Sequence, residues 1–422
     1  MKVALINTNR YLAPPVIPVG LEYLIVPLER RGHDVALCDL AFAADPEADL
    51  VSFLETERPE IIGFTARNVD NVLFHRNDFF LDEIAGLIIL ARQCSAAPVV
   101  AGGASTLCSV EGIRDCLAVD CLIVGPGEVA FPEVVDALSG NAPLPDFVDG
   151  WSAGIVADLV HSRGRLIDYR PYLEGGNPAG LEFRKGCDWG CGFCIERKRP
   201  ILRREVGAVV AEARALAAAG VDMFFLCDSE VNLDIDDTKD LLKAIADAGT
   251  GLKWSGYFRP VPFNREMARL AEGSGCGDLT LSVNSWDLSN GDGAYSEAEA
   301  REFLELCHDV GIKVAVDLLV GYPGEEPSSV DRAIQLLAAV GPETVAVNEF
   351  IRLYEDTPVA SLSLSPENAG RVIGETRGNR SMLKPVFFSC VERRWLSDRI
   401  SGEPNFVLAD AERTVNYLRV SE

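Results

Sequence analysis

The sequence predicts an α/β protein with two parallel sheets, each covered by helices. Two observations carry this prediction: short, nearly continuous apolar runs alternate with stretches of helix length over two long ranges, and Gly and Pro become frequent between these ranges. Strands that are buried on both faces read as continuous apolar runs, and their alternation with helices is typical of parallel sheets. A chain of 422 residues is long enough for two or three domains, each with its own core.

The first range, residues 1–138, predicts five β/α units. An amphipathic stretch at Val19–Arg31 predicts the first helix. The expected strands are Val3–Ile6, Asp34–Cys38, Ile61–Phe64, Pro98–Ala101 and Asp120–Val124. Units of this kind form an open, doubly wound parallel sheet of the Rossmann or flavodoxin type.

The second range, residues 181–350, follows a Gly- and Pro-rich stretch at 139–180 that we interpret as a linker. Its six β/α units predict a partial (β/α)6 TIM-like barrel, with a second open sheet as the alternative. Residues 351–422 are of mixed character, and we expect a small C-terminal region that caps the substrate side. The expected barrel strands are Leu181–Lys185, Met223–Cys227, Leu252–Tyr257, Leu279–Val283, Val314–Leu319 and Thr344–Asn348, and helices are expected at Val206–Ala219 and Glu297–Val310.

The composition narrows the possible partners. A total of 64 Asp and Glu against 39 Lys and Arg gives a formal net charge of −25, and no Lys- or Arg-rich stretch offsets it. Binding to phosphate backbones or anionic lipids needs concentrated positive charge, so neither nucleic acid nor a membrane is expected. The opening apolar run is too short for a secretory signal, and no run approaches the ~20 apolar residues of a membrane span. We therefore expect a cytoplasmic protein whose twelve cysteines are reduced thiols or metal ligands.

Three cysteines carry the most specific signal. Cys187, Cys191 and Cys194 are spaced C-x3-C-x2-C in a Gly-containing loop after an expected strand. This spacing lets three thiolates converge on one face of an iron–sulfur cluster. A structural zinc site normally uses four ligands in paired C-x2-C motifs, and no second pair follows nearby. Three buried thiols without a metal are the remaining alternative.

This segment resembles the radical S-adenosylmethionine (SAM) superfamily. The resemblance covers the cysteine spacing, Phe193 just before the last cysteine, the position after the first barrel strand and the later β/α rhythm. It implies that Cys187, Cys191 and Cys194 hold a [4Fe–4S] cluster whose open iron binds SAM, and that Phe193 lies at the cofactor. It also implies an external electron donor of the flavodoxin or ferredoxin type.

The resemblance implies further SAM-binding residues at the ends of the barrel strands. Helix capping, an ordinary turn or a surface ion pair would account for the same residues. Asn284 departs from the family, which usually has Glu at this position. The candidates are Ser229 and Glu230 after the second strand, Arg259 after the third, Ser282 and Asn284 at the fourth and Gly321 after the fifth.

The first domain has glycines where its expected strands end. Glycines at the carboxyl ends of parallel strands give a ligand close access to backbone amides. In this order, upstream of the cysteine loop, the set resembles the cobalamin-binding domain joined to many radical SAM methyltransferases. The implied cobalamin-binding residues are Gly102, Gly103, Ser105, Gly125, Gly127 and Glu128, with Arg67, Asn68 and Asp70 in the loop after the third strand.

A histidine ligand for cobalt is not expected. The Asp-x-His-x-x-Gly sequence of other cobalamin proteins is absent, and none of His33, His75, His161 and His308 has that context. Arg67 would disfavour axial ligation because a guanidinium has no free lone pair. The alternative is that Arg67 and Asp70 pair with each other in a solvated loop.

Together these features favour a cobalamin-dependent radical SAM methyltransferase that acts on a carbon, or less often a phosphorus, of a small molecule or peptide. Arg352 and Tyr354 are the candidate catalytic residues facing the substrate. One rival is a radical SAM enzyme of another outcome, such as rearrangement, carbon–sulfur bond formation or transfer of the aminocarboxypropyl arm of SAM. The other rival is a non-enzymatic metal-binding module.

Overall fold

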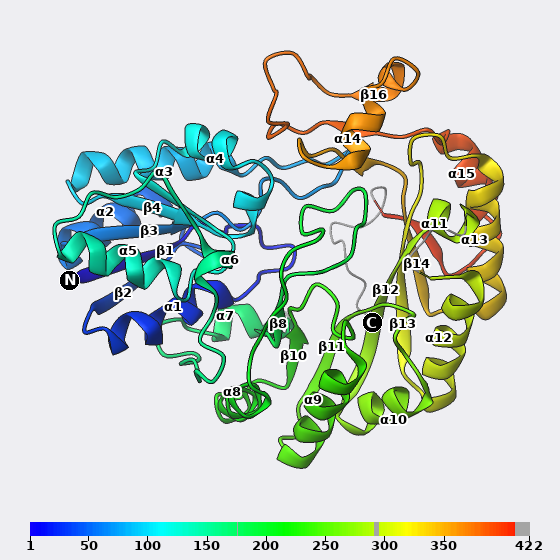
Figure 1. Cartoon of the computed structure of the whole chain (residues 1–422), viewed down its shortest axis with the longest axis horizontal. Helices are drawn as coiled ribbons and strands as arrows, with labels where there is room; N and C mark the ends of the chain where they lie inside the picture. The colour runs from blue at the N-terminus through cyan, green and yellow to red at the C-terminus, as the bar shows by residue number, and fades with distance from the viewer. Residues whose placement is uncertain (175, 291–294, 410–422) are drawn as a thin grey trace.

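The computed structural model describes residues 1–174, 176–290 and 295–409. It contains two parallel sheets that lie side by side, with a small C-terminal segment above their junction (Figure 1). No helix in the described part of the chain is long and apolar enough to span a membrane.

The first sheet has six parallel strands in the order β2-β1-β3-β4-β5-β6. Helices α2, α3 and α4 pack against one face through residues such as Leu54 and Leu87, and α1 and α5 cover the other through Ile25 and Phe131. This confirms the predicted doubly wound fold. The strands are β1 (Lys2–Asn7), β2 (Asp34–Asp39), β3 (Ile61–Thr65), β4 (Val99–Gly102), β5 (Cys121–Val124) and β6 (Phe147–Asp149), and the helices are α1 (Val19–Arg30), α2 (Pro46–Glu57), α3 (Leu81–Cys94), η1 (Ala104–Leu107), α4 (Val110–Leu117) and α5 (Ala130–Ser139).

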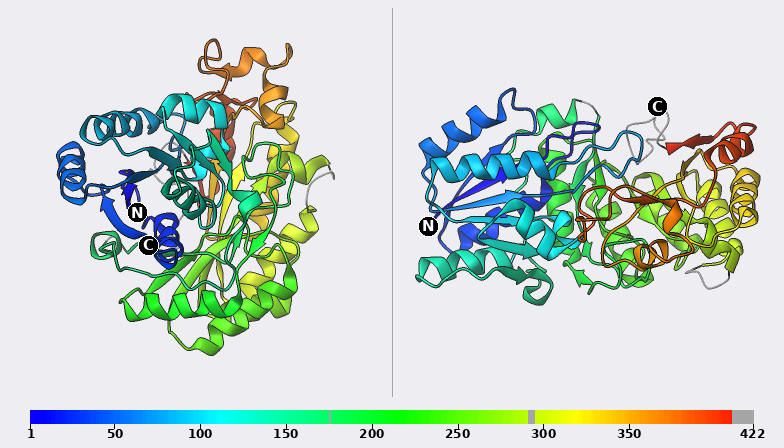
Figure 2. Two further views of the ribbon diagram at one scale, coloured as in Figure 1. Left: turned by 60° about the vertical axis from the view of Figure 1, so that its left-hand side comes forward. Right: turned by 90° about the horizontal axis from the view of Figure 1, so that it is seen from above.

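The second sheet has seven parallel strands in the order β18-β14-β13-β12-β11-β10-β7. Its strands, β18 included, follow one another in space in the order in which they follow in the sequence, and helices cover the outer face, as in a partial barrel (Figure 2). The strands are β7 (Ala179–Leu181), β10 (Met223–Leu226), β11 (Lys253–Phe258), β12 (Cys276–Asn284), β13 (Lys313–Leu319), β14 (Thr344–Asn348) and β18 (Phe406–Leu408), and the helices are α8 (Val206–Ala218), α9 (Ile235–Ala248), α10 (Arg265–Gly273), α11 (Ser285–Asn290), α12 (Glu297–Val310), α13 (Pro327–Val340) and α15 (Arg393–Ile400).

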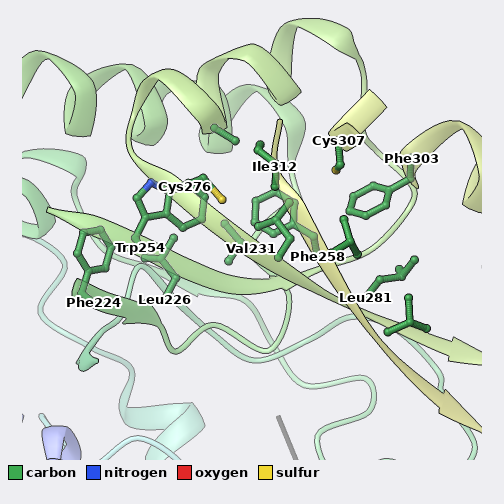
Figure 3. Packing of buried hydrophobic residues seen from close by; sticks show 14 of the residues in the cluster. Phe224, Leu226, Val231, Trp254, Phe258, Cys276, Leu281, Phe303, Cys307 and Ile312 are labelled. Carbon is green, nitrogen blue, oxygen red and sulfur yellow. The ribbon is translucent and has the colours of Figure 1, made fainter. Parts of the chain in front are cut away.

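The barrel core lies between this sheet and its helices (Figure 3). Trp254 of β11 is fully buried, stacks on Phe224 and Phe258, and donates from its indole nitrogen to Ser274 Oγ at 3.1 Å. Phe303 of α12 closes the core from the helix side. Burial of this apolar layer fixes the strand ends that carry the site.

The predicted first barrel strand, Leu181–Lys185, is wrong in its position. Strand β7 ends at Leu181, because the backbone N–H groups of Phe183 and Arg184 donate to the Asp228 carboxylate (2.8 and 3.0 Å) rather than continue the ladder. Arg184 and Lys185 form a separate short strand, β8. The cysteine loop therefore begins in a hairpin that has left the barrel.

Short elements complete the chain. Strand β6 lies within residues 139–180 and β18 within residues 351–422, so both ranges add a strand to a sheet; our division of the chain at 138, 180 and 350 stays a prediction. Residues 410–422 of the C-terminal range lie outside the described residues. The remaining elements are α6 (Gly150–Ala153), α7 (Arg170–Leu173), β8 (Arg184–Lys185), β9 (Leu202–Arg203), β15 (Ile351–Arg352), α14 (Pro358–Ser363), η2 (Ala369–Arg371), β16 (Val372–Ile373) and β17 (Phe387–Phe388).

Buried ion pairs join the two sheets. The guanidinium of Arg163 donates to Glu22 of α1 (2.9 Å) and to the carbonyl of Gly180 in β7 (2.8 Å), and it lies 3.5 Å from Glu212 of α8. The hydroxyl of Tyr169 donates to Glu22 at 2.6 Å. The side chains of Arg163 and Glu212 are 0% exposed, so any other arrangement of the two sheets would leave buried charges unpaired.

We predict that Arg163→Met lowers the free energy of unfolding by about 3–5 kcal/mol, because it leaves the Glu22 carboxylate buried without its cation. Chemical denaturation of the whole chain measures this. Arg170→Met, which removes an exposed ion pair with Asp168, is the control and should leave the unfolding free energy nearly unchanged. Equal effects of the two substitutions would contradict the role given to Arg163.

Candidate active site at the junction of the sheets

The cysteine loop is a hairpin closed by β8 and β9. These strands pair antiparallel, with Arg184 opposite Arg203. Gly186 begins the loop at φ +86°, and a Cβ there would lie 2.0 Å from the carbonyl oxygen of Pro200, so only glycine fits. Further backbone bonds, from Arg199 N to Cys187 O (2.8 Å) and from Cys194 N to Cys191 O (3.2 Å), hold the loop in shape.

The three cysteines are partly buried in this loop. Burial raises the pKa of the Cys191 thiol to about 11 and of the Cys194 thiol to about 12. Burial also raises the pKa of the Cys187 thiol, and a guanidinium nitrogen of Arg259, 4.0 Å from Cys187 Sγ, opposes this shift. Bound metal stabilises all three thiolates, because metal ligation keeps cysteine deprotonated.

Arg259 and Glu230 lie near these cysteines at the mouth of the barrel. Arg259 is 4% exposed, and its guanidinium stacks 3.0 Å from the ring centroid of Trp189. Burial raises the pKa of the Glu230 carboxyl to about 7, although Arg259 opposes this. Among the described residues, Glu230 Oε2 has no hydrogen-bond partner. The site therefore offers one unsatisfied carboxylate oxygen beside an arginine.

Other predicted SAM-site residues have protein partners. Asn284 Nδ2 donates to Asp287 at 2.8 Å, and the carbonyl of Ser282 accepts from Tyr295 at 2.6 Å. Gly321 is at φ +92°, and a Cβ there would lie 2.8 Å from Ser389 Oγ, so this glycine serves a close contact with the C-terminal segment.

Phe193 belongs to an aromatic cluster under that segment. Its ring meets Trp286 edge-on at 6.1 Å between centroids, and Trp286 stacks on Tyr322 at 4.5 Å. Because Tyr322 follows β13 and Phe193 precedes Cys194, this cluster ties the cysteine hairpin to the barrel ends.

A cavity of about 260 Å³ opens where the strands of the first sheet end. Its inner part is apolar and is lined by Val100, Ile123 and Phe131. Gly103, at φ +118°, passes so close to Ala66 that a Cβ would lie 2.5 Å from its carbonyl oxygen. The glycine-lined mouth comprises Gly102, Gly103, Gly125 and Gly127. The predicted glycines thus share one wall.

The barrel supplies the opposite wall of the same cavity. Ser229, after β10, donates a hydrogen bond to Glu196, which is two residues past Cys194, and both side chains line the cavity. Ser229 therefore lies between the cysteine hairpin and the first domain. Cys227 and Gly186 belong to the same wall.

A charged triad lines this cavity at the hairpin base. Lys185 Nζ lies 2.9 Å from Glu128 and 2.7 Å from Glu182. Burial raises the pKa of the Glu182 carboxyl to about 7, against the effect of Lys185. Glu128 was predicted as a cofactor-binding residue, and the structure places it at the cavity with Lys185 as its partner.

Two further cavities, of about 400 and 260 Å³, adjoin the first domain at the same edge. Arg67 and Asn68 line both of them. Ser105 lines the second, and its buried hydroxyl has no partner among the described residues. Ala104 lines this cavity and also the glycine-lined cavity, so the two cavities are neighbours on either side of this residue.

Asp70 and Arg352 form a buried ion pair; Asp70 also lines the cavity of Arg67, and its predicted role in cobalamin binding stays a prediction. Arg352 was predicted to face the substrate, but its Nε donates to Asp70 at 2.8 Å, and its other nitrogens donate to backbone carbonyls that include Met382 (2.9 Å) and Leu383 (2.8 Å). No N–H is left for a substrate. Asp70 pairs with Arg352 and not with Arg67, which corrects the alternative considered above.

Tyr354 does face a cavity. Its ring lies 4.8 Å from the Arg352 guanidinium, and the residue lines the cavity that Arg67 and Ser105 share. Burial raises the pKa of its hydroxyl well above the ordinary value, so it stays protonated. Tyr354 can therefore donate a hydrogen bond to a ligand.

None of the four histidines lines these cavities. His33 lies beside Asp136 (2.9 Å), and His161 is buried and stacks on Tyr23 at 4.1 Å. His75 contacts Arg393 at 2.8 Å, and His308 is exposed on α12.

Sequence reasoning missed several residues of the site. Trp151 lines the glycine-lined cavity, and its indole nitrogen has no partner in the described part of the chain; Glu196 accepts from Ser229 on the barrel wall of the same cavity. Asp317 of β13 accepts from Tyr257 at 3.2 Å, and burial raises the pKa of its carboxyl to about 7. The sequence signal for Asp317 was a charged residue in an otherwise apolar strand. The sequence contained no comparable signal for Trp151.

The comparisons with known proteins agree with this geometry. Residues 181–337 match the radical SAM superfamily and residues 9–135 the B12 binding domain. The tryptophan 2-C-methyltransferase of Streptomyces laurentii is 28% identical over 80% of this chain and 71% of its own. The hopanoid C-3 methylase of Methylococcus capsulatus is 26% identical over 72% of this chain and 60% of its own.

Solved structures share the fold. The radical S-adenosylmethionine methyltransferase TsrM of Kitasatospora setae, solved with its tryptophan substrate and a SAM analog, superposes with a TM-score of 0.86 at 23% identity, covering 97% of this chain and 91% of that one. The cobalamin-dependent enzyme OxsB gives 0.70 at 14% identity, with coverage of 92% and 64%.

Residues 181–337 belong to the radical SAM superfamily and residues 9–135 form a B12-binding domain, so the chain is an enzyme of this class. Its cofactors are a [4Fe–4S] cluster, SAM and cobalamin. The residues present fit all three: a three-thiol hairpin, an unsatisfied carboxylate beside it, and a glycine-lined space with unpartnered polar groups. In the described residues no three Cys, His, Asp or Glu side chains are grouped to hold one metal ion, whereas the thiolates of a cluster bind separate irons.

We predict that anaerobic reconstitution gives about four iron and four sulfide per chain, and that Cys187→Ala, Cys191→Ala or Cys194→Ala each abolishes this, since two thiolates leave the cluster under-ligated. Iron and sulfide analysis measures it. Cys276→Ala, which removes a buried thiol of the barrel core, should keep the iron. A triple-cysteine variant that still held the cluster would refute the assignment.

Proposed function

We propose that this enzyme transfers a methyl group from SAM, by way of cobalamin, to a carbon of a small molecule. One observation carries the proposal: the carboxyl ends of both sheets open onto one cavity, with Gly103 on one wall and Ser229 and Glu196 on the other. A cofactor held by the first domain and one held by the cysteine hairpin would meet there. Parallel sheets bind ligands at this edge.

The relatives support methylation and a small substrate. The two named above are a tryptophan 2-C-methyltransferase and a hopanoid C-3 methylase, which both act on carbon in small molecules. Because the first covers most of this chain, tryptophan and related aromatic amino acids are the first substrates to test.

The bound cofactors would supply methyl transfer and one-electron chemistry, and the chain supplies their positions. Cys187, Cys191 and Cys194 would hold the cluster. The free oxygen of Glu230 would accept a hydrogen bond from the SAM amino group, which fixes the orientation of SAM. Arg259 neutralises part of the thiolate charge and keeps Glu230 from being an isolated anion.

In the first domain, the close approach of glycine backbone would let the nucleotide tail and ring of cobalamin contact peptide N–H groups. Arg67 lines a neighbouring part of this edge and, because a guanidinium has no free lone pair, would offer cobalt no nitrogen ligand. Tyr354 would face the same space from the C-terminal segment as a hydrogen-bond donor.

We also propose that the electrons come from an external carrier of the flavodoxin or ferredoxin type and that the enzyme works in the cytoplasm. The cluster hairpin supports the first proposal, since partly buried thiols lie close to the surface loop 197–200. The twelve cysteines, all free, suit a reducing compartment.

We predict that Glu230→Ala weakens SAM binding about tenfold or more without loss of iron, because it removes a charge-assisted hydrogen bond. Asn284→Ala should have a smaller effect, since Asn284 already bonds to Asp287. Equilibrium binding of SAM to reconstituted protein measures both. Glu297→Ala, on the exposed face of α12, is the control. If both site variants bound SAM as tightly as the wild type, the proposed position of SAM beside Glu230 and Asn284 would be wrong.

We predict that the reconstituted enzyme, supplied with a reductant, cobalamin and SAM deuterated in its methyl group, gives a product that carries the deuterated methyl group. Mass spectrometry of a reaction with tryptophan, and then of a panel of small aromatic and aliphatic substrates, measures this. SAM cleavage with a rearranged or sulfur-containing product would favour the first rival. Absence of any SAM cleavage would overturn the enzymatic assignment.

A further inference from the structure

The segment 67–80 connects β3 to α3 and begins at the cavity lined by Arg67, Ser105 and Tyr354, which we include in the space proposed for cobalamin and call the cobalamin space. Its first two residues, Arg67 and Asn68, line the two cavities at the sheet edge. At its base, Ala66 N donates to Gly102 O at 2.7 Å, which ties the segment to β4 of its own sheet. Beyond this point the chain leaves the sheet.

Internal hydrogen bonds give the segment a compact shape. Asn71 Nδ2 donates to the carbonyl of Arg76 (2.7 Å) and to Asp78 (3.1 Å), and Phe80 N donates to Val69 O (2.9 Å). These bonds close the segment on itself. They do not fix where it lies relative to the cavity.

The C-terminal segment supplies the missing anchor. Asp70 accepts from Arg352, which is 282 positions later in the chain, and the two side chains are 0% and 4% exposed. Arg352 is in turn held by carbonyls of residues 382–386 as well as its neighbour Leu353. The ion pair therefore connects the segment 67–80 to the C-terminal segment that contains Arg352 and residues 382–386.

Aromatic contacts extend this junction. Phe74 stacks on Phe350 with 4.0 Å between centroids and meets Phe387 edge-on at 5.4 Å. Phe387 lies in β17, which pairs with Arg352 in β15. The tip of the segment and its first residues are thus held by the same small sheet.

We propose that Arg352 is a positioning residue for cobalamin: through Asp70 it holds the segment 67–80 so that Arg67 lies in the cobalamin space, and through its contact with the Tyr354 ring it fixes the opposite wall. The proposal rests on the proposed function for the identity of the ligand. Its physical basis is that Asp70 without Arg352 is a buried carboxylate with no cation, which drives the segment outward to water.

This arrangement gives the C-terminal segment a part in the chemistry of a cofactor bound by the amino-terminal domain. If the segment 67–80 moved out, Arg67 would leave this space and would no longer limit the access of water to a bound cobalamin. The electronic state of the bound cobalamin therefore depends on a pair that touches neither cobalt nor substrate.

The test compares Arg352→Met and Asp70→Ala with Asp70→Asn, whose amide oxygen still accepts from Arg352. Hydrogen–deuterium exchange on the protein without cobalamin comes first. Peptides from 67–80 should exchange faster in Arg352→Met and Asp70→Ala than in the wild type, and at the wild-type rate in Asp70→Asn. Peptides from β4 and η1 should exchange at the wild-type rate in all three variants. The control is Arg265→Met, which breaks an arginine–aspartate pair between α10 and α12, with Asp309, on the helices that cover the barrel.

Cobalamin binding and the electron paramagnetic resonance spectrum of its Co(II) form come second. Affinity should fall about tenfold or more in Arg352→Met and Asp70→Ala, with a changed cobalt spectrum, and should recover in Asp70→Asn. Slow exchange in 67–80 together with an unaltered spectrum in both disrupting variants overturns the proposal. If Arg352→Met does not fold, Asp70→Ala against Asp70→Asn decides the same point. Wild-type protein that binds no cobalamin refutes the proposed function, whatever the exchange data show.

Discussion

Burial of Arg163 between Glu22 and Glu212 is the constraint on which the rest of the structure depends. It brings α1 of the first sheet against α8 of the second. If either carboxylate moved away from Arg163, a buried charge would be left without its partner. The ends of β4, β5 and β10 then open onto the same cavity. Two folds that each bind a ligand at a strand edge thereby share one reaction space.

Other buried acidic groups of the site also lie beside cations. The net charge is −25, and cations lie beside the acidic groups around the cysteine hairpin: Lys185 contacts both Glu128 and Glu182, and Arg259 lies near Cys187 and Glu230. A cluster held by three thiolates adds negative charge, and a nearby arginine lowers the cost of placing it there. Among the described residues, the buried atoms without a hydrogen-bond partner include Glu230 Oε2 beside the cysteines and Ser105 Oγ at a cavity of the first domain.

The sequence was informative where local pattern decides the structure. Apolar runs predicted β1 to β5 and β10 to β14 to within a few residues, because parallel strands buried on both faces need such runs. Strand β6 was not predicted, because it is only three residues long and its Phe147 is exposed. Strand β7 ended early because Asp228, 45 residues away, takes the backbone bonds of its continuation.

In the site, too, local patterns could be predicted from the sequence and contacts between distant residues could not. The cysteine spacing is local and could be interpreted directly, whereas the role of Arg352 depends on Asp70, which is 282 residues distant and gives no pattern in the sequence. The glycines were placed correctly at the strand ends, but part of their use is to admit protein groups, such as the carbonyl of Ala66 beside Gly103.

The central claim is that one cavity brings the cofactors of the two domains together. Electron paramagnetic resonance of protein that holds both the reduced cluster and Co(II) cobalamin tests it most directly. The account predicts magnetic coupling, with both signals broadened or split relative to protein that holds either cofactor alone. A spectrum equal to the simple sum of the two isolated signals would contradict it.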